Sequence, residues 1–372
     1  MQSSNSTLAR ECAALLRSPS PSVPALLGFD GFVDTICDAV ETRHSAQSYS
    51  RIPTLRAFGE RIAAAAGKSA NVEIVPTRLK LGGNGPIMAN ALGALGLSVT
   101  YCGMTGLAAP HEVFTEFSTR AKLLPICDPA FTDAYEFDDG KLIVGKHATV
   151  AQVTWSNIEQ NVGRDVFTKA WQEARFVGIV NWTMLPFMTD LWRAMQAELP
   201  KQSERKTLFF DLADPEKRAR EDIFEALNTI ALFGQEHEVI LGLNEKEALQ
   251  VAQTLDISTP LGDVLDHDSA PQLAGAIRAR LEIGVVVIHP TRFAASASAE
   301  DAACVDGPWI ANPLISTGAG DHFNAGFCLG QLLGGSLAQS LQIGVGTSGF
   351  YVRSAKSPTK EELAGFLEEI SE

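Results

Sequence analysis

Short runs of consecutive apolar residues recur along this chain, and segments with the apolar spacing of amphipathic helices separate them. The clearest runs lie within the expected strands at residues 176–180, 207–212, 239–242 and 285–289. Strands that are apolar on both faces are typical of parallel sheets, because helices cover both sides of such a sheet. Crossovers between parallel strands are right-handed, so the alternation predicts a doubly wound, mostly parallel α/β sheet.

Two segments interrupt this alternation in the first half of the chain. Residues 33–81 show an extended, then a helical, then an extended pattern. The turn sequence Asp138-Asp139-Gly140 joins two short extended runs and indicates a hairpin with polar, half-exposed strands. We therefore expect one domain over residues 1–372, with a discontinuous, small β-rich lid formed by the segments near 33–81 and 128–157.

The charge balance excludes several classes of partner. The chain has 30 Lys and Arg against 44 Asp and Glu, a formal net charge of −14, which opposes binding to nucleic acid or to an anionic membrane. The 6 cysteines form no Cys-x-x-Cys pair, the pattern of reduced thiols. The N-terminus lacks a signal-peptide layout, and no apolar run is long enough to span a bilayer. We expect a cytoplasmic protein with small-molecule ligands.

The strongest local motif is Gly318-Ala319-Gly320-Asp321, which stands directly before an apolar-periodic helix. Glycines at a helix start let a ligand approach the main chain, and the free N–H groups there suit an anion such as phosphate. The helix macrodipole favours an ionised carboxylate in the first turn, so we expect Asp321 to carry its charge. Alone, the motif is equally compatible with an ordinary acidic helix start.

Three further polar clusters follow predicted strands. They are Gly82-Gly83-Asn84 before a helix, Asp30 with Asp34 after the first strand, and Asn244 with Glu247 at another helix start. A turn, an acidic loop and a helix cap would explain each one separately. Because open α/β sheets bind ligands at the carboxyl ends of their strands, four such clusters together indicate one ligand site.

Two well-known phosphate-binding loops are excluded by their spacing. A Walker A loop ending at Gly67-Lys68-Ser69 would need glycine where Ile62 stands. A dinucleotide fingerprint starting at Gly318 would need glycine where Phe323 stands. The glycines at 318 and 320 therefore belong to a different kind of anion site.

In these four motifs and their order, residues 25–353 resemble the ribokinase-like (PfkB-type) carbohydrate kinase family. Gly318-Ala319-Gly320-Asp321 is similar to the family signature, Asn244-Glu245-Lys246-Glu247 to its NxxE motif, and Gly82-Gly83-Asn84 to its early glycine motif. The resemblance implies phosphoryl transfer from ATP with Mg²⁺. It implies Asp321 as the base, Gly318, Ala319 and Gly320 as an anion hole, and Asn244 with Glu247 around the magnesium. It places Asp34, Gly83 and Asn84, together with Asp30 and Gly82, at the sugar.

Three positions depart from the family pattern. Ile315 stands where many members have an aspartate that helps to bind a monovalent cation, and Ile87 stands where an asparagine often contacts the sugar. His289-Pro290-Thr291-Arg292 replaces a glycine-containing run near the nucleotide and is reminiscent of the ADP-dependent sugar kinases. We therefore assign His289, Thr291 and Arg292, with Asn244, to the nucleotide, and ADP stays open as the donor.

These observations favour a sugar kinase that uses ATP. The alternatives are a nucleoside kinase of the same fold, an ADP-dependent sugar kinase, and a sugar- or nucleotide-binding regulator without catalysis. Expected partners are a sugar and a nucleotide, with no nucleic acid and no membrane, and a second copy of the chain that pairs through the lid.

Overall fold

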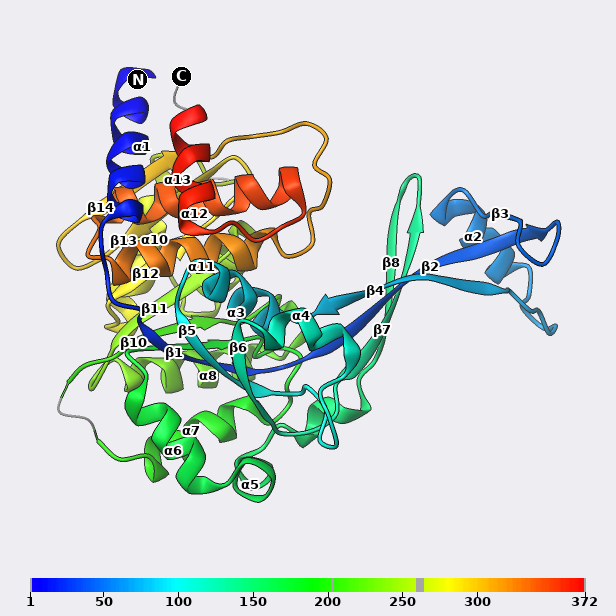
Figure 1. The fold of residues 1–372 in the computed structure, drawn as a ribbon, viewed down its shortest axis with the longest axis horizontal. Coiled ribbons are helices and arrows are strands. Elements are labelled where there is room, and N and C mark those ends of the chain that lie inside the picture. Colours follow the sequence, from blue (N-terminus) through cyan, green and yellow to red (C-terminus); the bar gives the residue numbers. More distant parts are fainter. Residues whose placement is uncertain (1, 202–203, 259–263, 371–372) are drawn as a thin grey trace.

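A nine-stranded sheet organises the described part of the chain, which in this computed structural model comprises residues 2–201, 204–258 and 264–370 (Figure 1). The strand order is β14-β13-β12-β11-β10-β9-β1-β5-β6, and all neighbours pair in parallel except β12-β13 and β13-β14. The strands are β1 (Pro24–Phe29), β5 (Ser98–Gly103), β6 (Ala121–Pro125), β9 (Phe176–Val180), β10 (Thr207–Asp211), β11 (Glu238–Leu243), β12 (Val285–Ile288), β13 (Phe293–Ala297) and β14 (Ala302–Asp306). The doubly wound, mostly parallel α/β fold is confirmed.

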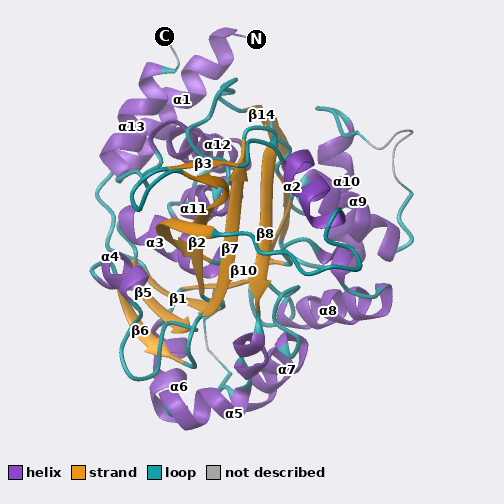
Figure 2. Cartoon of the chain, turned by 90° about the vertical axis from the view of Figure 1, so that its right-hand side faces the viewer, coloured by secondary structure: helices purple, strands orange, loops and turns teal. Residues whose placement is uncertain are grey.

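Helices cover both faces of this sheet (Figure 2). One face carries α1 (Gln2–Arg17), α3 (Asn84–Ala94), α4 (Thr115–Ser118), α11 (Ala319–Leu332), α12 (Leu337–Ser354) and α13 (Lys360–Glu369). The other carries α6 (Arg164–Glu173), α7 (Met188–Glu198), α8 (Arg220–Phe233), α9 (Glu245–Thr254) and α10 (Ser269–Leu281), with the short α5 (Trp155–Asn157) beside α6. The two ends of the chain lie side by side in α1 and α13, where Arg17 pairs with Glu361.

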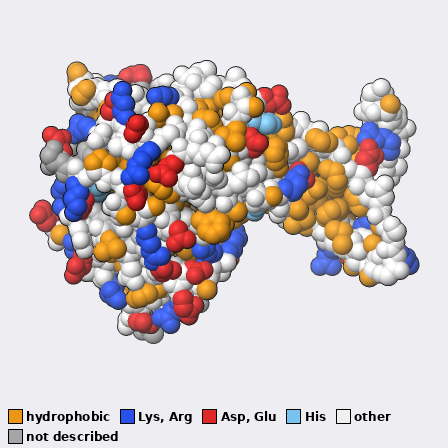
Figure 3. Space-filling view, turned by 90° about the horizontal axis from the view of Figure 1, so that it is seen from below, with side chains coloured by type: hydrophobic (Ala, Val, Ile, Leu, Met, Phe, Trp, Pro, Cys, Tyr) orange, Lys and Arg blue, Asp and Glu red, His pale blue; other side chains and the backbone are white. Residues whose placement is uncertain are grey.

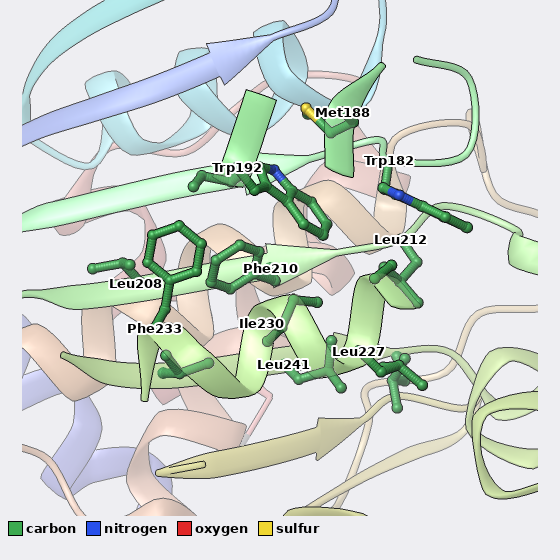
Figure 4. Packing of buried hydrophobic residues seen from close by; sticks show 14 of the residues in the cluster. Trp182, Met188, Trp192, Leu208, Phe210, Leu212, Leu227, Ile230, Phe233 and Leu241 are labelled. Atoms are coloured by element: carbon green, nitrogen blue, oxygen red, sulfur yellow. The ribbon is translucent and has the colours of Figure 1, made fainter. Parts of the chain in front are cut away.

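The core follows from the fully apolar strands. In the layer under α7 and α8, Trp192 packs edge-on against Phe210 of β10, with ring centroids 5.3 Å apart, and Phe233 lies on the other side of Phe210 (Figure 4). Burial of one such large side chain stabilises the fold by roughly 1.5–3 kcal/mol. This packing makes a rigid sheet, so loops at its edge are held in fixed positions.

The lid is a second, five-stranded sheet that projects from the body (Figure 1). Its strands are β2 (Phe32–Arg43), β3 (Tyr49–Arg51), β4 (Ile74–Gly82), β7 (Ala130–Phe137) and β8 (Gly140–Lys146). At the far end, Phe58 of α2 (Leu55–Ala63) packs against Tyr135 and Phe137 and closes a small separate core. The hairpin turn at Asp138-Asp139-Gly140 connects β7 and β8, as the sequence predicts.

Several local expectations differ from the structure. Val150 and Val153 pack into the core of the body, so the segment after β8 leaves the lid before residue 157. The antiparallel strands β13 and β14, which extend the sheet beyond β12, were not among the predicted strands. The division of residues 1–372 into one domain with a lid stays a prediction. Within the described ranges, no helix is both long and apolar enough to cross a membrane.

Candidate active site

The predicted polar clusters meet at one edge of the central sheet. Asp30 follows β1, Asn244 follows β11 and His289 follows β12, and these strands run parallel. Parallel strands end at the same edge, which also receives the start of α11. The topology therefore gathers residues that lie far apart in the sequence.

Asp321 lies in the first turn of α11 and faces the start of α3. The side-chain amide of Asn84 donates a hydrogen bond to Oδ1 of Asp321, at 3.0 Å. Gly83, directly before Asn84, has a φ of 96°, a left-handed conformation that favours glycine. The glycine motif thus turns the chain so that Asn84 reaches the carboxylate.

Burial changes the charge state expected for Asp321. Only 7% of the residue is exposed, and this desolvation raises its pKa to about 7, although the Asn84 hydrogen bond opposes the shift. The nearby carboxylates of Asp30 and Glu247 raise the pKa further, and Lys80 lowers it. Burial therefore opposes the effect of the helix dipole, and a pKa of about 7 makes Asp321 less ionised near neutral pH than the helix start alone predicts. A carboxyl group with this pKa suits a general base.

Asp30 has a different position from the one expected. It is completely buried, and its carboxylate accepts hydrogen bonds from the Gly85 N–H, at 2.9 Å, and from Nδ2 of Asn181, at 2.6 Å. The hydroxyl of Tyr101 donates to its carbonyl oxygen, at 2.6 Å. Asp30 therefore offers no exposed oxygen to a sugar. It anchors the first turn of α3, and so helps to place Asn84.

The lid contributes Asp34 on β2. Its neighbours are Gly82 and Lys80 on β4, and a Cβ at Gly82 would lie only 2.5 Å from the carboxyl carbon of Asp34. Thr132 of β7 bonds to the same carboxyl group, and burial raises its pKa despite Lys80. The lid thus pairs a carboxylate with an ammonium group, and the Lys80 charge also lowers the pKa of Asp321.

Asn244 and Glu247 form a capping box at the start of α9. Asn244 Oδ1 accepts from the Glu247 N–H and Glu247 Oε2 accepts from the Asn244 N–H, both at 2.9 Å. Glu247 Oε1 accepts from the Asp214 N–H at 2.7 Å. These bonds fix the Glu247 carboxylate in place. They do not test its predicted role at magnesium.

Asp211, at the end of β10, belongs to the site although the sequence analysis did not select it. Its Oδ2 accepts from Nδ2 of Asn324 at 2.8 Å. Burial, together with repulsion from Glu247 and Asp321, raises its pKa well above the ordinary value. Asp211 could have been found from the sequence, because it is an acidic residue directly after an apolar run, where open α/β sheets bind ligands. Lys80 had no comparable signal, since it stands in the middle of a polar strand pattern.

The loop Gly318-Ala319-Gly320, here called the anion loop, borders a pocket of about 430 Å³ in the body of the protein. Asn244, His289 and Thr291 line it together with Ala319 and Gly320, and Trp309 forms part of its apolar wall. Burial lowers the pKa of His289 to about 4, so its ring is neutral and packs on Phe323, with centroids 4.8 Å apart. The structure therefore brings together three of the four residues assigned to the nucleotide.

Arg292 is the fourth, and it does not line this pocket. Its exposed guanidinium lies over the ring of Trp309, 4.9 Å from the centroid. Its backbone carbonyl accepts from the Gly307 N–H at 2.8 Å. In this arrangement Arg292 supports the back of Trp309, and a direct clamp on a terminal phosphate would require the side chain to turn.

Comparison with known proteins identifies the family of this chain. The sequence model of the prokaryotic ketohexokinase family matches residues 5–370, nearly the whole chain. The chain belongs to this family. A ketohexokinase from Haloferax volcanii is 30% identical over 350 residues, which cover 92% of this chain and 90% of that protein. As a member of the family, the protein is a carbohydrate kinase with a ribokinase-like fold.

Solved structures agree on the fold. Phosphofructokinase-2 from Escherichia coli, in complex with substrates and products, has a TM-score of 0.61 at 14% identity and covers 95% of this chain and 100% of its own. Arabidopsis thaliana ribokinase, complexed with ribose and ATP, has a TM-score of 0.62 at 14% identity, with 94% and 99% coverage. A carbohydrate kinase from Agrobacterium tumefaciens has a TM-score of 0.61 at 16% identity, with 92% and 96% coverage.

Proposed function

We propose that this sugar kinase transfers a phosphoryl group from ATP to a ketohexose hydroxyl, with Asp321 as the base. The observation that carries the proposal is the position of Asp321: it bonds to Asn84, directly follows Gly320 of the pocket wall, and is close enough to Lys80 of the lid for that charge to lower its pKa. A carboxyl group there can accept the hydroxyl proton as the bond to phosphorus forms. The ketohexose is taken from the name of the Haloferax relative.

Other residues of the chain bind the phosphoryl group, hold the sugar and exclude water. The loop Gly318-Ala319-Gly320 offers main-chain N–H groups to the charge that develops on the transferred phosphoryl group. Asp34 and Asn84 hold the sugar hydroxyls, with Gly82 and Gly83 leaving room beside them. Asp30 acts indirectly, through the start of α3. Closure of the lid would exclude water and suppress nucleotide hydrolysis.

The residues near Glu247 fit Mg²⁺. Buried carboxylates at Asp211 and Glu247 repel each other, and the buried amide oxygen of Asn324 finds no hydrogen-bond partner among the described residues. Mg²⁺ in kinase sites is typically held by one or two carboxylates, with water and substrate phosphates completing its shell. When bound, Mg²⁺ would offset charge on the phosphates. Asn244 and Glu247, with Asp211, would hold its water shell.

ATP is the proposed donor, and ADP is the alternative. The pocket beside Gly320 has an apolar wall that includes Trp309, as a purine requires. Arg292 stacks on the outside of that wall, so nothing in this arrangement favours the ADP-dependent interpretation. A cytoplasmic location stays a prediction.

A substrate panel tests the proposal. Initial rates are measured with D-fructose, aldohexoses, ribose and nucleosides, each with ATP and with ADP freed of the other nucleotide. We expect the highest kcat/KM with a ketohexose and ATP. A nucleoside that exceeds every sugar would establish the nucleoside-kinase alternative, and faster transfer from ADP would overturn the donor. Binding of sugar or nucleotide without any turnover would establish the regulator.

We further propose that two copies pair through their lids. Strand register places Leu79, Phe131, Leu142 and Val144 on one face of the lid sheet, opposite the face of Asp34 and Lys80. Each of the four is at least 37% exposed, and Figure 3 shows apolar side chains on this narrow arm. A second copy would cover this face symmetrically. Light scattering that finds a monomer at assay concentration, unchanged in Val144→Lys, would exclude this pairing.

A further inference from the structure

The loop that precedes Asp321 is held from behind by two aromatic side chains. The Tyr351 hydroxyl donates a hydrogen bond to the Thr317 carbonyl, at 2.9 Å. The imidazole of His322 bonds through Nδ1 to the Gly318 carbonyl, at 2.7 Å. Both side chains are buried, with 6% of Tyr351 and 2% of His322 exposed. The consecutive carbonyls of Thr317 and Gly318 therefore each have a side-chain partner, and the Gly318 carbonyl also accepts a helical hydrogen bond from the His322 N–H, at 3.1 Å.

The bond to a carbonyl decides the tautomer of His322. A carbonyl oxygen only accepts hydrogen bonds, so Nδ1 must carry the proton. In the neutral ring Nε2 is then an acceptor, and the Ser357 hydroxyl donates to it at 2.9 Å. Burial lowers the pKa of His322 to about 4, which keeps the ring neutral near pH 7. The side chain links the anion loop to the segment that follows α12.

The two rings also support each other. His322 and Tyr351 stack with centroids 3.6 Å apart and planes inclined by 13°. His322 belongs to α11 and Tyr351 to α12, so the stack joins the two helices directly beneath the loop. Gly318, with a φ of 93°, has no side chain of its own to stabilise this conformation. The loop therefore depends on its neighbours for its orientation.

Orientation of these carbonyls sets the direction of the N–H groups. In a planar trans peptide the C=O and the following N–H point in opposite directions, so holding the Thr317 carbonyl aims the Gly318 N–H away from the aromatic pair. Holding the Gly318 carbonyl likewise orients the next peptide, whose Ala319 N–H donates to the Ser316 carbonyl, at 3.1 Å, and so holds the loop in its turn. Preorganised N–H groups stabilise a transition state because they need no rearrangement during the reaction.

We propose that His322 is a positioning residue for phosphoryl transfer: its neutral ring, held by Tyr351 and Ser357, fixes the Gly318 carbonyl and with it the orientation of the glycine loop beside Asp321. This rests on the proposed role of residues 318–320 as the anion loop. A purely structural role would change stability and leave kcat alone. A positioning role lowers kcat more than it raises the KM for either substrate, because the aligned N–H groups act on charge that develops in the transition state.

Three variants separate these roles. His322→Phe keeps a ring for stacking and removes both nitrogens, Tyr351→Phe removes one hydroxyl, and Ser357→Ala removes only the distant partner of the imidazole. We expect kcat to fall about tenfold or more in His322→Phe and about threefold in the other two, with each KM within about threefold of wild type. His322→Gln, which retains an N–H donor, should recover part of the loss. His44→Gln, on the exposed end of the lid, is the matched control.

The readouts also distinguish the inference from the proposed function. A wild-type protein without ketohexose kinase activity contradicts the proposed function, whereas an active wild type with unchanged kcat in both His322→Phe and Ser357→Ala overturns the inference. The ¹⁵N NMR shifts of the ring give a readout independent of activity. We expect a protonated Nδ1 and an unprotonated Nε2 between pH 6 and about 8, and the opposite tautomer would also overturn the inference. Thermal unfolding confirms that each variant is folded.

Discussion

Asn84 Nδ2 lies 3.0 Å from Asp321 Oδ1, and this bond joins residues that are 237 positions apart in the sequence. It connects the start of α3 to the start of α11, two helix ends that each follow a glycine with positive φ. The bond favours the ionised form of Asp321, whereas burial disfavours it. The balance of these two effects gives the carboxyl group a pKa close to the pH at which the enzyme would act.

Asp321→Asn tests the base. The amide retains the size of the side chain but cannot accept a proton, so we expect kcat to fall by about 10²-fold or more. ATP affinity, measured by isothermal titration, should remain within about threefold, since the N–H groups of the loop persist. Asp268→Asn, at the exposed start of α10, is the control. Turnover within a few-fold of wild type would remove Asp321 from the mechanism.

The pH profile should report the same group. Because the pKa of Asp321 is about 7 and the base must be ionised, kcat/KM should rise with pH through about 7. The charge of Lys80 lowers this pKa, so Lys80→Met should move the midpoint to higher pH. Lys122→Met, on the exposed side of β6, should leave the profile unchanged. A shift of the midpoint to lower pH in Lys80→Met would contradict the placement of Lys80 near Asp321.

Stability should depend on pH in the opposite sense to activity. The pKa values of Asp30 and Asp321 are raised to about 6 and about 7 in the folded chain, so the folded state binds more protons than the unfolded state between about 4 and 7. Their contribution to stability is present below pH 4 and lost as the pH rises through these values. Asp321→Asn removes the buried charge and should raise Tm at pH 8 by a few degrees, with little effect at about pH 5. Equal Tm changes at both pH values would contradict this.

Glu247→Gln separates capping from metal binding. The glutamine keeps one oxygen for a backbone hydrogen bond but turns its NH2 group toward the other N–H donor, from Asn244 or Asp214, so we expect a loss of stability of about 1–3 kcal/mol. If Glu247 holds the water shell of Mg²⁺, the Mg²⁺ concentration for half-maximal rate should rise about tenfold. Glu362 occupies the same position in the capping box of α13, so Glu362→Gln is the matched control. If the Mg²⁺ dependence of Glu247→Gln is unchanged, Glu247 acts only as part of the helix cap and not at the metal.

The donor site can be tested at Trp309 and Arg292. With ATP as the donor, Trp309→Ala should raise the KM for ATP about tenfold, because an aromatic contact with the base is lost. Arg292→Ala should raise it less than about threefold, because the guanidinium stacks behind the ring. If the enzyme transfers faster from ADP, Arg292→Ala should instead lose most donor affinity, as a bidentate contact with the terminal phosphate would require.

Local patterns were sufficient for much of the fold. The residues of β9, and Leu208 to Phe210 of β10, are apolar without interruption, as expected for parallel strands that are buried on both faces. Local sequence was likewise enough to find two helix starts, because each is made by residues close together in the chain: Gly318-Ala319-Gly320-Asp321, and the capping pair Asn244 and Glu247. The N-terminal helix α1 was not expected, because its stability comes from contacts with α13 and α12 at the other end of the chain.

By itself, the sequence determined which residues stand at strand ends and helix starts, because hydrophobic period, glycine and caps act over short distances. Only the tertiary structure decided their chemistry. Asp30 and Asp34 are both acidic residues near the first strand. Asp30 is buried under α3, whereas Asp34 lies in the lid and pairs in register with Lys80 of the neighbouring lid strand. Charge and pKa depend on solvent exclusion and on neighbours distant in sequence, such as Asn84 for Asp321, and these exist only once the sheet has brought them together.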